Sequence, residues 1–139
     1  MLFFQPECKE SWLEFGQSCY WFSIYMQSLP ASQKVCQNMN SHLVSLQSSD
    51  EHDFIINHRP DPTKDTWIGL HRDTTNLTVW KWSSGEEFQY TNWADGEPNF
   101  ETEECASIHG SNYHAAGHEN LWNDFGCGAS YRFVCEQQL

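Results

Sequence analysis

Two short clusters of oxygen-bearing side chains stand out in this sequence of 139 residues. Their members are Glu97, Asn99, Glu101, Glu103 and Glu104 in the first cluster, and Asn123 and Asp124 in the second. Carboxylate and amide oxygens are the ligands that calcium prefers in proteins. A solvated surface is the ordinary explanation for an acidic loop, but it does not explain why amides stand between the acids. The pattern therefore favours a bound calcium ion.

The overall charge narrows the range of possible partners. The chain has 7 Lys and Arg against 19 Asp and Glu, which gives a formal net charge of −12. Nucleic-acid binding requires a basic surface, so no nucleic-acid partner is expected. The 7 Trp, 5 Tyr and 9 Phe supply large buried areas, which predicts one packed domain. The sequence contains no apolar run of about 18 residues, so no transmembrane helix is predicted.

Six cysteines indicate an oxidising compartment. They stand at positions 8, 19, 36, 105, 127 and 135. An even number of cysteines in a short, loop-rich chain predicts three disulfides and an extracellular protein. Zinc binding is the alternative, but none of the spacings is Cys-x2-Cys, and spacing alone selects no pairing. The sequon Asn76-Leu77-Thr78 fits a secreted glycoprotein.

Two helices and several strands must position the two clusters. The first helix is expected over about 31–39 behind the cap residue Ser28, and the second over about 49–58 behind the capping box of Ser48 and Glu51. Strands are expected at about 19–22, 43–46, 66–70, 79–82, 105–108 and 131–136. Residues 89–104 are expected to form a long loop, and residues 122–124 also lie in loop-like sequence. This order of elements predicts a small α+β domain.

The motifs resemble those of a known family. The C-type lectin domain has the same motifs in this order: Trp67-Ile68-Gly69-Leu70, Glu97-Pro98-Asn99, Trp122-Asn123-Asp124 and six cysteines. The resemblance covers residues 8–136, and residues 1–7 are expected to be a linker or an expression stub. The asialoglycoprotein-receptor-like group is especially similar in its framework motifs, which are Cys19-Tyr20-Trp21-Phe22-Ser23, Gly69-Leu70-His71 and Trp80-Lys81-Trp82.

The resemblance implies the C-type lectin fold in its long form. That fold has two helices, antiparallel sheets and a long calcium-binding loop. It also implies three disulfides, which are Cys8–Cys19, Cys36–Cys135 and Cys105–Cys127. The bridge between residues 36 and 135 closes the longest loop, so it should stabilise most, by about 4–5 kcal/mol in the chain-entropy model.

The resemblance also implies one calcium site that binds a sugar. Its ligands would be Glu97, Asn99, Glu103, Asn123 and Asp124, with a cis bond between residues 97 and 98. Calcium takes about 6–8 oxygens, so two adjacent sugar hydroxyls can complete its coordination. Each hydroxyl can also accept a hydrogen bond from an Asn amide and donate one to a Glu carboxylate.

The order Glu-Pro-Asn accompanies mannose, fucose and N-acetylglucosamine in this family, whereas Gln-Pro-Asp accompanies galactose. The chain thus resembles the galactose-receptor group in its framework and the mannose group at its site. We expect the site to determine which sugar is bound. Phe100 and His114 are expected to add ligand contacts. A complete second calcium site is not expected, because Asp73 is the only acidic residue in the segment 72–77 that would supply it.

Several alternatives stay open at this point. The ligand could be a galactose-type glycan, a protein or a lipid, and His114 and His118 could bind zinc on a helix. No enzyme is expected, because hydrolase and phosphate-loop motifs are missing from the sequence. Glu97 and Glu103 could mimic a glycosidase pair, but calcium coordination uses them better.

The expected partners are glycans on glycoproteins or on microbial surfaces, as in innate immunity. The parent is expected to be extracellular and clustered or oligomeric, either as the ectodomain of a (possibly type II) membrane receptor or as a secreted lectin. Sugar binding is expected to fall below about pH 6, as carboxylates and histidines gain protons.

Overall fold

The computed structural model describes residues 7–112 and 117–139. Within these ranges the chain forms two helices, α1 (Leu29–Asn38) and α2 (Ser49–His58). It also forms eight strands: β1 (Leu13–Phe15), β2 (Ser18–Phe22), β3 (His42–Leu43), β4 (Thr66–Arg72), β5 (Trp80–Trp82), β6 (Cys105–Ile108), β7 (Trp122–Phe125) and β8 (Arg132–Gln138). The predicted α+β class is confirmed. None of the helices in the described part of the chain has the length and apolar character needed to span a bilayer.

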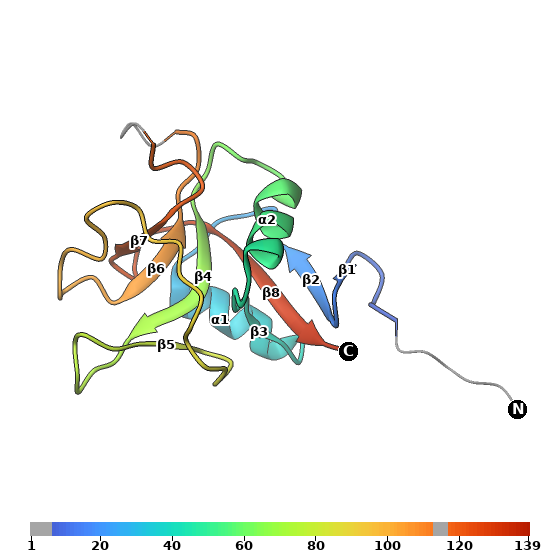
Figure 1. Ribbon diagram of the computed structural model, residues 1–139. Helices are drawn as coiled ribbons and strands as arrows, with labels where there is room; N and C mark the ends of the chain where they lie inside the picture. The colour runs from blue at the N-terminus through green and yellow to red at the C-terminus, as the bar shows by residue number, and fades with distance from the viewer. Residues whose placement is uncertain (1–6, 113–116) are drawn as a thin grey trace, which may run out of the picture.

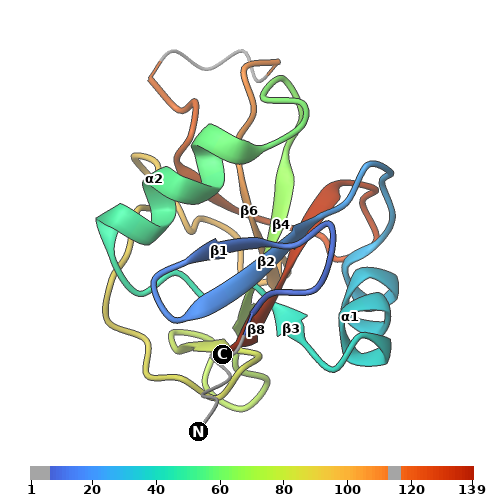
Figure 2. The same ribbon diagram turned by 90° about the vertical axis from the view of Figure 1, so that its right-hand side faces the viewer.

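The strands form one connected network in the order β1-β2-β8-β4-β6-β7, with β3 beside β8 and β5 beside β4. Figure 1 shows β5, β6 and β7 on the side of the molecule away from β1 and β2, together with the long loop that precedes β6. Figure 2 shows α1 and α2 on either side of the β1-β2-β8 strands. This arrangement separates a helix-flanked half from a loop-rich half.

The expectation of purely antiparallel sheets is wrong at one pair of strands. β4 and β8 run parallel, with Thr66 opposite Arg132 and Trp67 opposite Phe133. Parallel neighbours cannot be joined by a tight turn and need a long connection. The chain between β4 and β8 supplies that connection, and it contains both predicted calcium-ligand clusters.

Both helices begin where the sequence predicts a cap. Ser28 Oγ accepts a hydrogen bond from the backbone N–H of Ala31 at 3.3 Å, and α1 begins at residue 29, two residues earlier than expected, because Pro30 fits the first turn. In α2, Ser48 Oγ accepts from the N–H of Glu51 at 3.1 Å. The Glu51 side chain does not complete the capping box, since its Oε1 accepts from the N–H of Gln47 at 2.8 Å.

All three expected disulfides are present. They are Cys8–Cys19, Cys36–Cys135 and Cys105–Cys127, with Cα–Cα distances of 5.5, 5.3 and 5.3 Å. The second joins α1 to β8, and the third joins the start of β6 to the segment after β7. The loop that precedes β6 is therefore covalently braced at its downstream end.

Two strand predictions are wrong. The strand expected over 43–46 shortens to His42–Leu43, because Val44 donates to Val134 at 2.9 Å but accepts from Gly69 at 2.9 Å, so the chain crosses between strands instead of following one. Residues 122–124 were expected in a loop, but they form β7 and pair with β6, with Asn123 opposite Ser107 and Asp124 opposite Ala106. The sequence does not reveal this strand, because two of its four residues are polar and Trp122 is its only large buried apolar residue.

Candidate functional site

The long loop is attached to β7 along its base. Trp93 forms an isolated parallel bridge with Trp122. Ala94 donates its N–H to the carbonyl of Trp122 at 2.9 Å, and Trp122 donates to the carbonyl of Asn92 at 2.8 Å. These bonds lay the middle of the loop alongside β7, which carries the second predicted cluster.

An aromatic cluster fixes this attachment. Trp122 is fully buried, and the rings of Trp82, Tyr90 and Trp93 meet it edge-on at centroid distances of 5.7, 5.9 and 5.7 Å. Edge-to-face aromatic pairs are favourable beyond their buried area. The loop residues that precede the acidic cluster are therefore held by packing, before any ligand is considered.

Asp124 joins the two predicted clusters. Its side chain is completely buried, and its two carboxylate oxygens accept from the N–H of Asn99 at 3.2 Å each. Its Oδ2 also accepts from the N–H of Phe100 at 3.1 Å. The bond between Glu97 and Pro98 is cis, as expected. A carboxylate on β7 thus holds the backbone that follows this cis bond.

The acids of the loop crowd negative charge together. The pKa of Glu97 is raised to about 8, chiefly by burial and also by hydrogen bonding to Asp124 and by the charges of Asp124 and Glu103. Burial and the charge of Asp124 also raise the pKa of Glu103, although Arg72 opposes the shift. Glu97 Oε2 is buried and has no hydrogen-bond partner among the described residues. A hard cation that prefers carboxylate oxygens fits this set, because it would satisfy the orphaned oxygen and relieve the repulsion.

The remaining predicted site residues differ in exposure. Asn123 is buried beside Asp124 on β7, whereas Asn99 lies at the surface of the loop. Phe100 is 59% exposed, so its ring is free to contact a ligand. His114 lies outside the described residues, so the zinc pair predicted from the sequence is described only at its second member, the half-buried His118.

Sequence reasoning missed Arg72 at this site. Its guanidinium is buried, and Nη2 donates to Asp124 Oδ2 at 3.2 Å. An arginine at the end of a strand is ordinarily a surface residue, so its type gave no signal. One hint was present in the sequence: the segment 72–77 has a single acid, Asp73, where a second calcium site would need two.

The family model for the lectin C-type domain matches residues 25–137. The chain belongs to the C-type lectin family. This is a family of carbohydrate-binding modules that are typically not enzymes and that generally bind calcium.

Relatives of this lectin domain include cell-surface receptors. Asialoglycoprotein receptor 2 of the mouse is 37% identical over 94% of this chain, which covers 42% of the receptor. The chain therefore spans less than half the length of that relative. The murine dendritic cell inhibitory receptor 2, solved in complex with an N-glycan, is 28% identical with a TM-score of 0.84 over 96% of this chain and all of that domain.

The fold alone does not imply calcium. A calcium-independent type II antifreeze protein superposes with a TM-score of 0.83 at 23% identity, over 95% of each chain. The case for calcium in this lectin domain accordingly depends on its own residues, above all on the crowded carboxylates of Glu97, Glu103 and Asp124.

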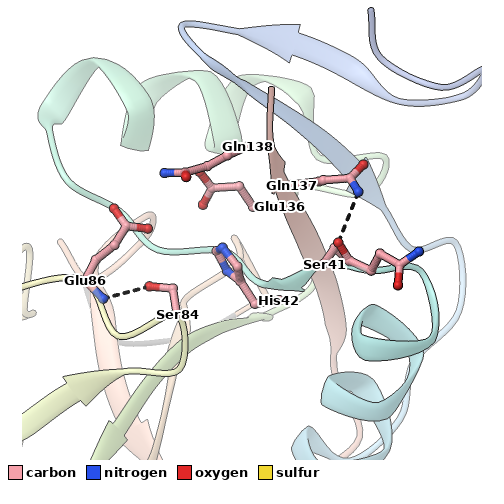
Figure 3. Close-up of a pocket in the computed structure, with 8 residues that line it drawn as sticks. Ser41, His42, Ser84, Glu86, Glu136, Gln137 and Gln138 are labelled. Atoms are coloured by element: carbon pink, nitrogen blue, oxygen red, sulfur yellow. Dashed lines mark hydrogen bonds between the residues drawn. The ribbon is translucent and has the colours of Figure 1, made fainter. Parts of the chain in front are cut away.

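A second acidic site lies in the helix-flanked half of the lectin domain. His42, Glu86 and Glu136 place one ligand atom each within 4.8 Å of one another, beside a pocket of about 460 Å³ (Figure 3). Glu136 is 3% exposed, but both its oxygens are used, since Oε2 accepts from Ser18 Oγ at 2.7 Å and Oε1 from the N–H of Ser45 at 3.1 Å. We assign this carboxylate to the packing of β8.

Proposed function

We propose that residues 8–136 form a carbohydrate-recognition domain that binds mannose-type glycans through a calcium ion. The ligands in question present mannose, fucose or N-acetylglucosamine. The observation that carries the proposal is the junction at Asp124, which holds the Glu-Pro-Asn turn through the N–H groups of Asn99 and Phe100. Beside it, Glu97 has a raised pKa and an orphaned oxygen, as a cation ligand would before the cation arrives.

The proposed division of labour follows from the residue types. Calcium, held by Glu97, Asn99, Glu103, Asn123 and Asp124, would supply coordination to two adjacent sugar hydroxyls. The side-chain amides of the two asparagines can donate hydrogen bonds to those hydroxyls, and the carboxylates of the two glutamates can accept hydrogen bonds from them. The order of donors and acceptors along the loop would then select the stereochemistry of the diol.

Two features next to the loop support a ligand larger than one sugar ring. The exposed ring of Phe100 can contact an apolar sugar face. Pro98 and Asn99 also line a pocket of about 470 Å³, together with Leu77, Trp80 and Trp93. His114 stays a prediction as a further ligand contact.

A galactose-type ligand is the second candidate. The framework of the chain is similar to that of the asialoglycoprotein receptors, whose name refers to glycoproteins without sialic acid. We favour the mannose type because the ligand contacts the Glu-Pro-Asn loop and not the framework.

We also propose that the parent protein is extracellular and presents several copies of the domain. The three disulfides support an oxidising compartment. A single sugar touches few atoms, so one domain should bind weakly, and clustered copies would gain avidity on glycoproteins or microbial surfaces.

A glycan array at millimolar calcium, repeated with a chelator, tests the proposal. We expect signal on mannose- and fucose-terminated glycans that disappears on chelation. Calcium-dependent signal on galactose alone would favour the second candidate. Absence of glycan signal under both conditions would contradict the function and point to a protein or lipid ligand.

A pair of loop variants sharpens the specificity test. Glu97→Gln combined with Asn99→Asp exchanges the acceptor and donor sides of the site, so we expect preference to move from mannose toward galactose. The matched control is Asp95→Asn, which removes an exposed acid of the same loop that is neither a proposed ligand nor part of the pocket lining. The control should bind the same glycans as the parent.

A further inference from the structure

Arg72 lies at the end of β4 and is only 6% exposed. Its guanidinium donates to three backbone carbonyls and one carboxylate from separate segments. These acceptors are Leu77 O at 2.6 Å, Phe100 O at 2.9 Å, Glu103 O at 3.3 Å and Asp124 Oδ2 at 3.2 Å. The guanidinium therefore ties together the 73–79 loop, the acidic loop and β7.

The rest of the residue reinforces this position. The backbone N–H of Arg72 donates to the carbonyl of Glu104 at 2.8 Å. The plane of its guanidinium lies over the ring of Trp80 at 4.6 Å from the centroid. A planar cation with several fixed donors suits such a site, because each bond to a charged group is stronger than a neutral one.

The oxygens around Arg72 are those that a metal ion would otherwise take. Three carbonyls and a carboxylate surround this one guanidinium, and oxygens of these types are the ligands that a hard cation binds. The acid in the neighbouring loop is already committed, since Asp73 pairs with Lys81 at 2.6 Å and accepts from Thr75 and Asn76. No carboxylate of that loop is therefore left over for a second ion.

We propose that Arg72 is a built-in cation that holds the acidic loop in its binding conformation without metal and occupies the place of a second calcium beside the first. Arg72 is a positioning residue in this account, since it reaches the ligand side only through Asp124 and the loop backbone. The loop is then ordered in the metal-free protein, and calcium has less ordering entropy to overcome on binding.

Amide hydrogen exchange in the calcium-free protein tests the first half of the proposal. We compare Arg72→Gln and Arg72→Lys with the parent at the amides of Asn99, Phe100 and Glu103, which are hydrogen-bonded in the loop. Losing a charged hydrogen-bond network should accelerate their exchange about tenfold or more in Arg72→Gln. Arg72→Lys keeps the charge and should be intermediate, and it carries the test if Arg72→Gln does not fold.

Arg59 provides a matched control. It is also a buried arginine, 8% exposed, and its guanidinium donates to Ile56 O, His109 O and Asn120 Oδ1, none of which lies in the acidic loop. Arg59→Gln should lower the melting temperature without accelerating exchange at residues 99–103. Equal acceleration in the Arg59 and Arg72 variants, or none in either, would overturn the proposal.

Calcium stoichiometry tests the second half, which rests on the proposed calcium-dependent function. Arg72→Asp removes the guanidinium and adds an acid among the freed oxygens. By isothermal titration with calcium alone, we expect this variant to bind one calcium more than the parent. If the folded variant binds the same number of calcium ions as the parent, the proposal that Arg72 occupies the place of a second calcium is wrong. A parent that binds no calcium would contradict the proposed function, while the exchange experiment would still decide the role of Arg72 in loop order.

Discussion

Two acidic regions of this lectin domain use similar residues for different ends. In the acidic loop, Glu97 lies beside Asp124 and Glu103, and in the helix-flanked half, Glu136 lies near Glu51. Burial and a neighbouring carboxylate raise the pKa of Glu97 and of Glu136 alike to about 8. Charge crowding is thus the same in kind at both places.

The regions differ in their supply of hydrogen-bond donors. The hydroxyl of Tyr20 donates to Glu51, and Ser18 and the backbone of Ser45 donate to Glu136. In the loop, Asp124 has donors on both oxygens, but Glu97 Oε2 has none among the described residues. A buried carboxylate whose oxygens are fully satisfied serves packing, whereas one left short of donors is where a cation is needed. The number of hydrogen-bond donors therefore distinguishes the packing carboxylate from the proposed cation ligand, whereas acidity does not.

The largest effect is expected from Asp124→Asn. The amide nitrogen would face the N–H groups and the guanidinium that Asp124 now accepts from. Losing charged hydrogen bonds of about 1.5–3 kcal/mol each should weaken glycan binding by about a hundredfold or more. Surface plasmon resonance on mannosylated albumin measures it, with Asp95→Asn as the control. Binding within threefold of the control, on the order of measurement scatter, would contradict the role of Asp124.

A pH dependence of calcium binding should follow from Glu97. Because its pKa in the metal-free protein is raised to about 8, Glu97 carries a proton below that pH, and calcium must displace it. We expect apparent calcium affinity to rise by up to about tenfold per pH unit for one proton and to level off above pH 8. Calorimetric titrations from pH 6 to pH 9 measure it. A flat profile would show that Glu97 does not bind the ion, and flat glycan binding between pH 7.5 and 5 would contradict the expected acid loss.

Glu136→Gln should change the pH dependence of stability instead of ligand binding. A carboxyl whose pKa rises from 4.5 to about 8 on folding stabilises the fold fully below its unfolded pKa and loses that contribution as pH rises toward 8. Glutamine does not titrate, so the variant should not lose this stability. Its unfolding free energy should therefore increase relative to that of the parent as pH rises from 5 to 8, on the order of 1.4 kcal/mol per pKa unit. Urea unfolding in calcium-free buffer measures it.

The control for Glu136 is the exposed Glu14 on β1. Glu14→Gln should leave the pH profile of the parent unchanged. If the unfolding free energies of the parent and of Glu136→Gln change with pH in the same way, the pKa of Glu136 is not raised by folding. A neighbouring positive charge would then stabilise the ionised carboxylate.

The smallest effect is expected from Tyr20→Phe, which removes the hydroxyl that donates to Glu51. Leaving a buried acceptor short of a donor costs about 1–3 kcal/mol of unfolding free energy. Glycan affinity should not change, because this region lies away from the loop. Tyr25→Phe serves as the control, since Tyr25 is 45% exposed. A loss of glycan binding in Tyr20→Phe would show that the two acidic regions are coupled.

Local features could be predicted because their causes are local. Ser28 and Ser48 cap helices through bonds three residues away, and the cis bond at Pro98 follows a family motif of three residues. The disulfides could be predicted only through the resemblance, since spacing alone left the pairing open. The loop character of residues 122–124 was mispredicted, because the strand is defined by its partner β6 and not by its own periodicity.

By itself the sequence determined which oxygen-bearing side chains the two clusters contain, the six cysteines and the net negative charge, since these depend on residue type alone. Only the tertiary structure decided which oxygens have donors. Arg72 and Asp124 are separated by 52 residues in the sequence, and Ser18 and Glu136 by 118. No local sequence pattern predicts contacts between residues so far apart. Whether a buried carboxylate has hydrogen-bond donors depends on which residues folding places next to it, and that placement depends on the whole chain.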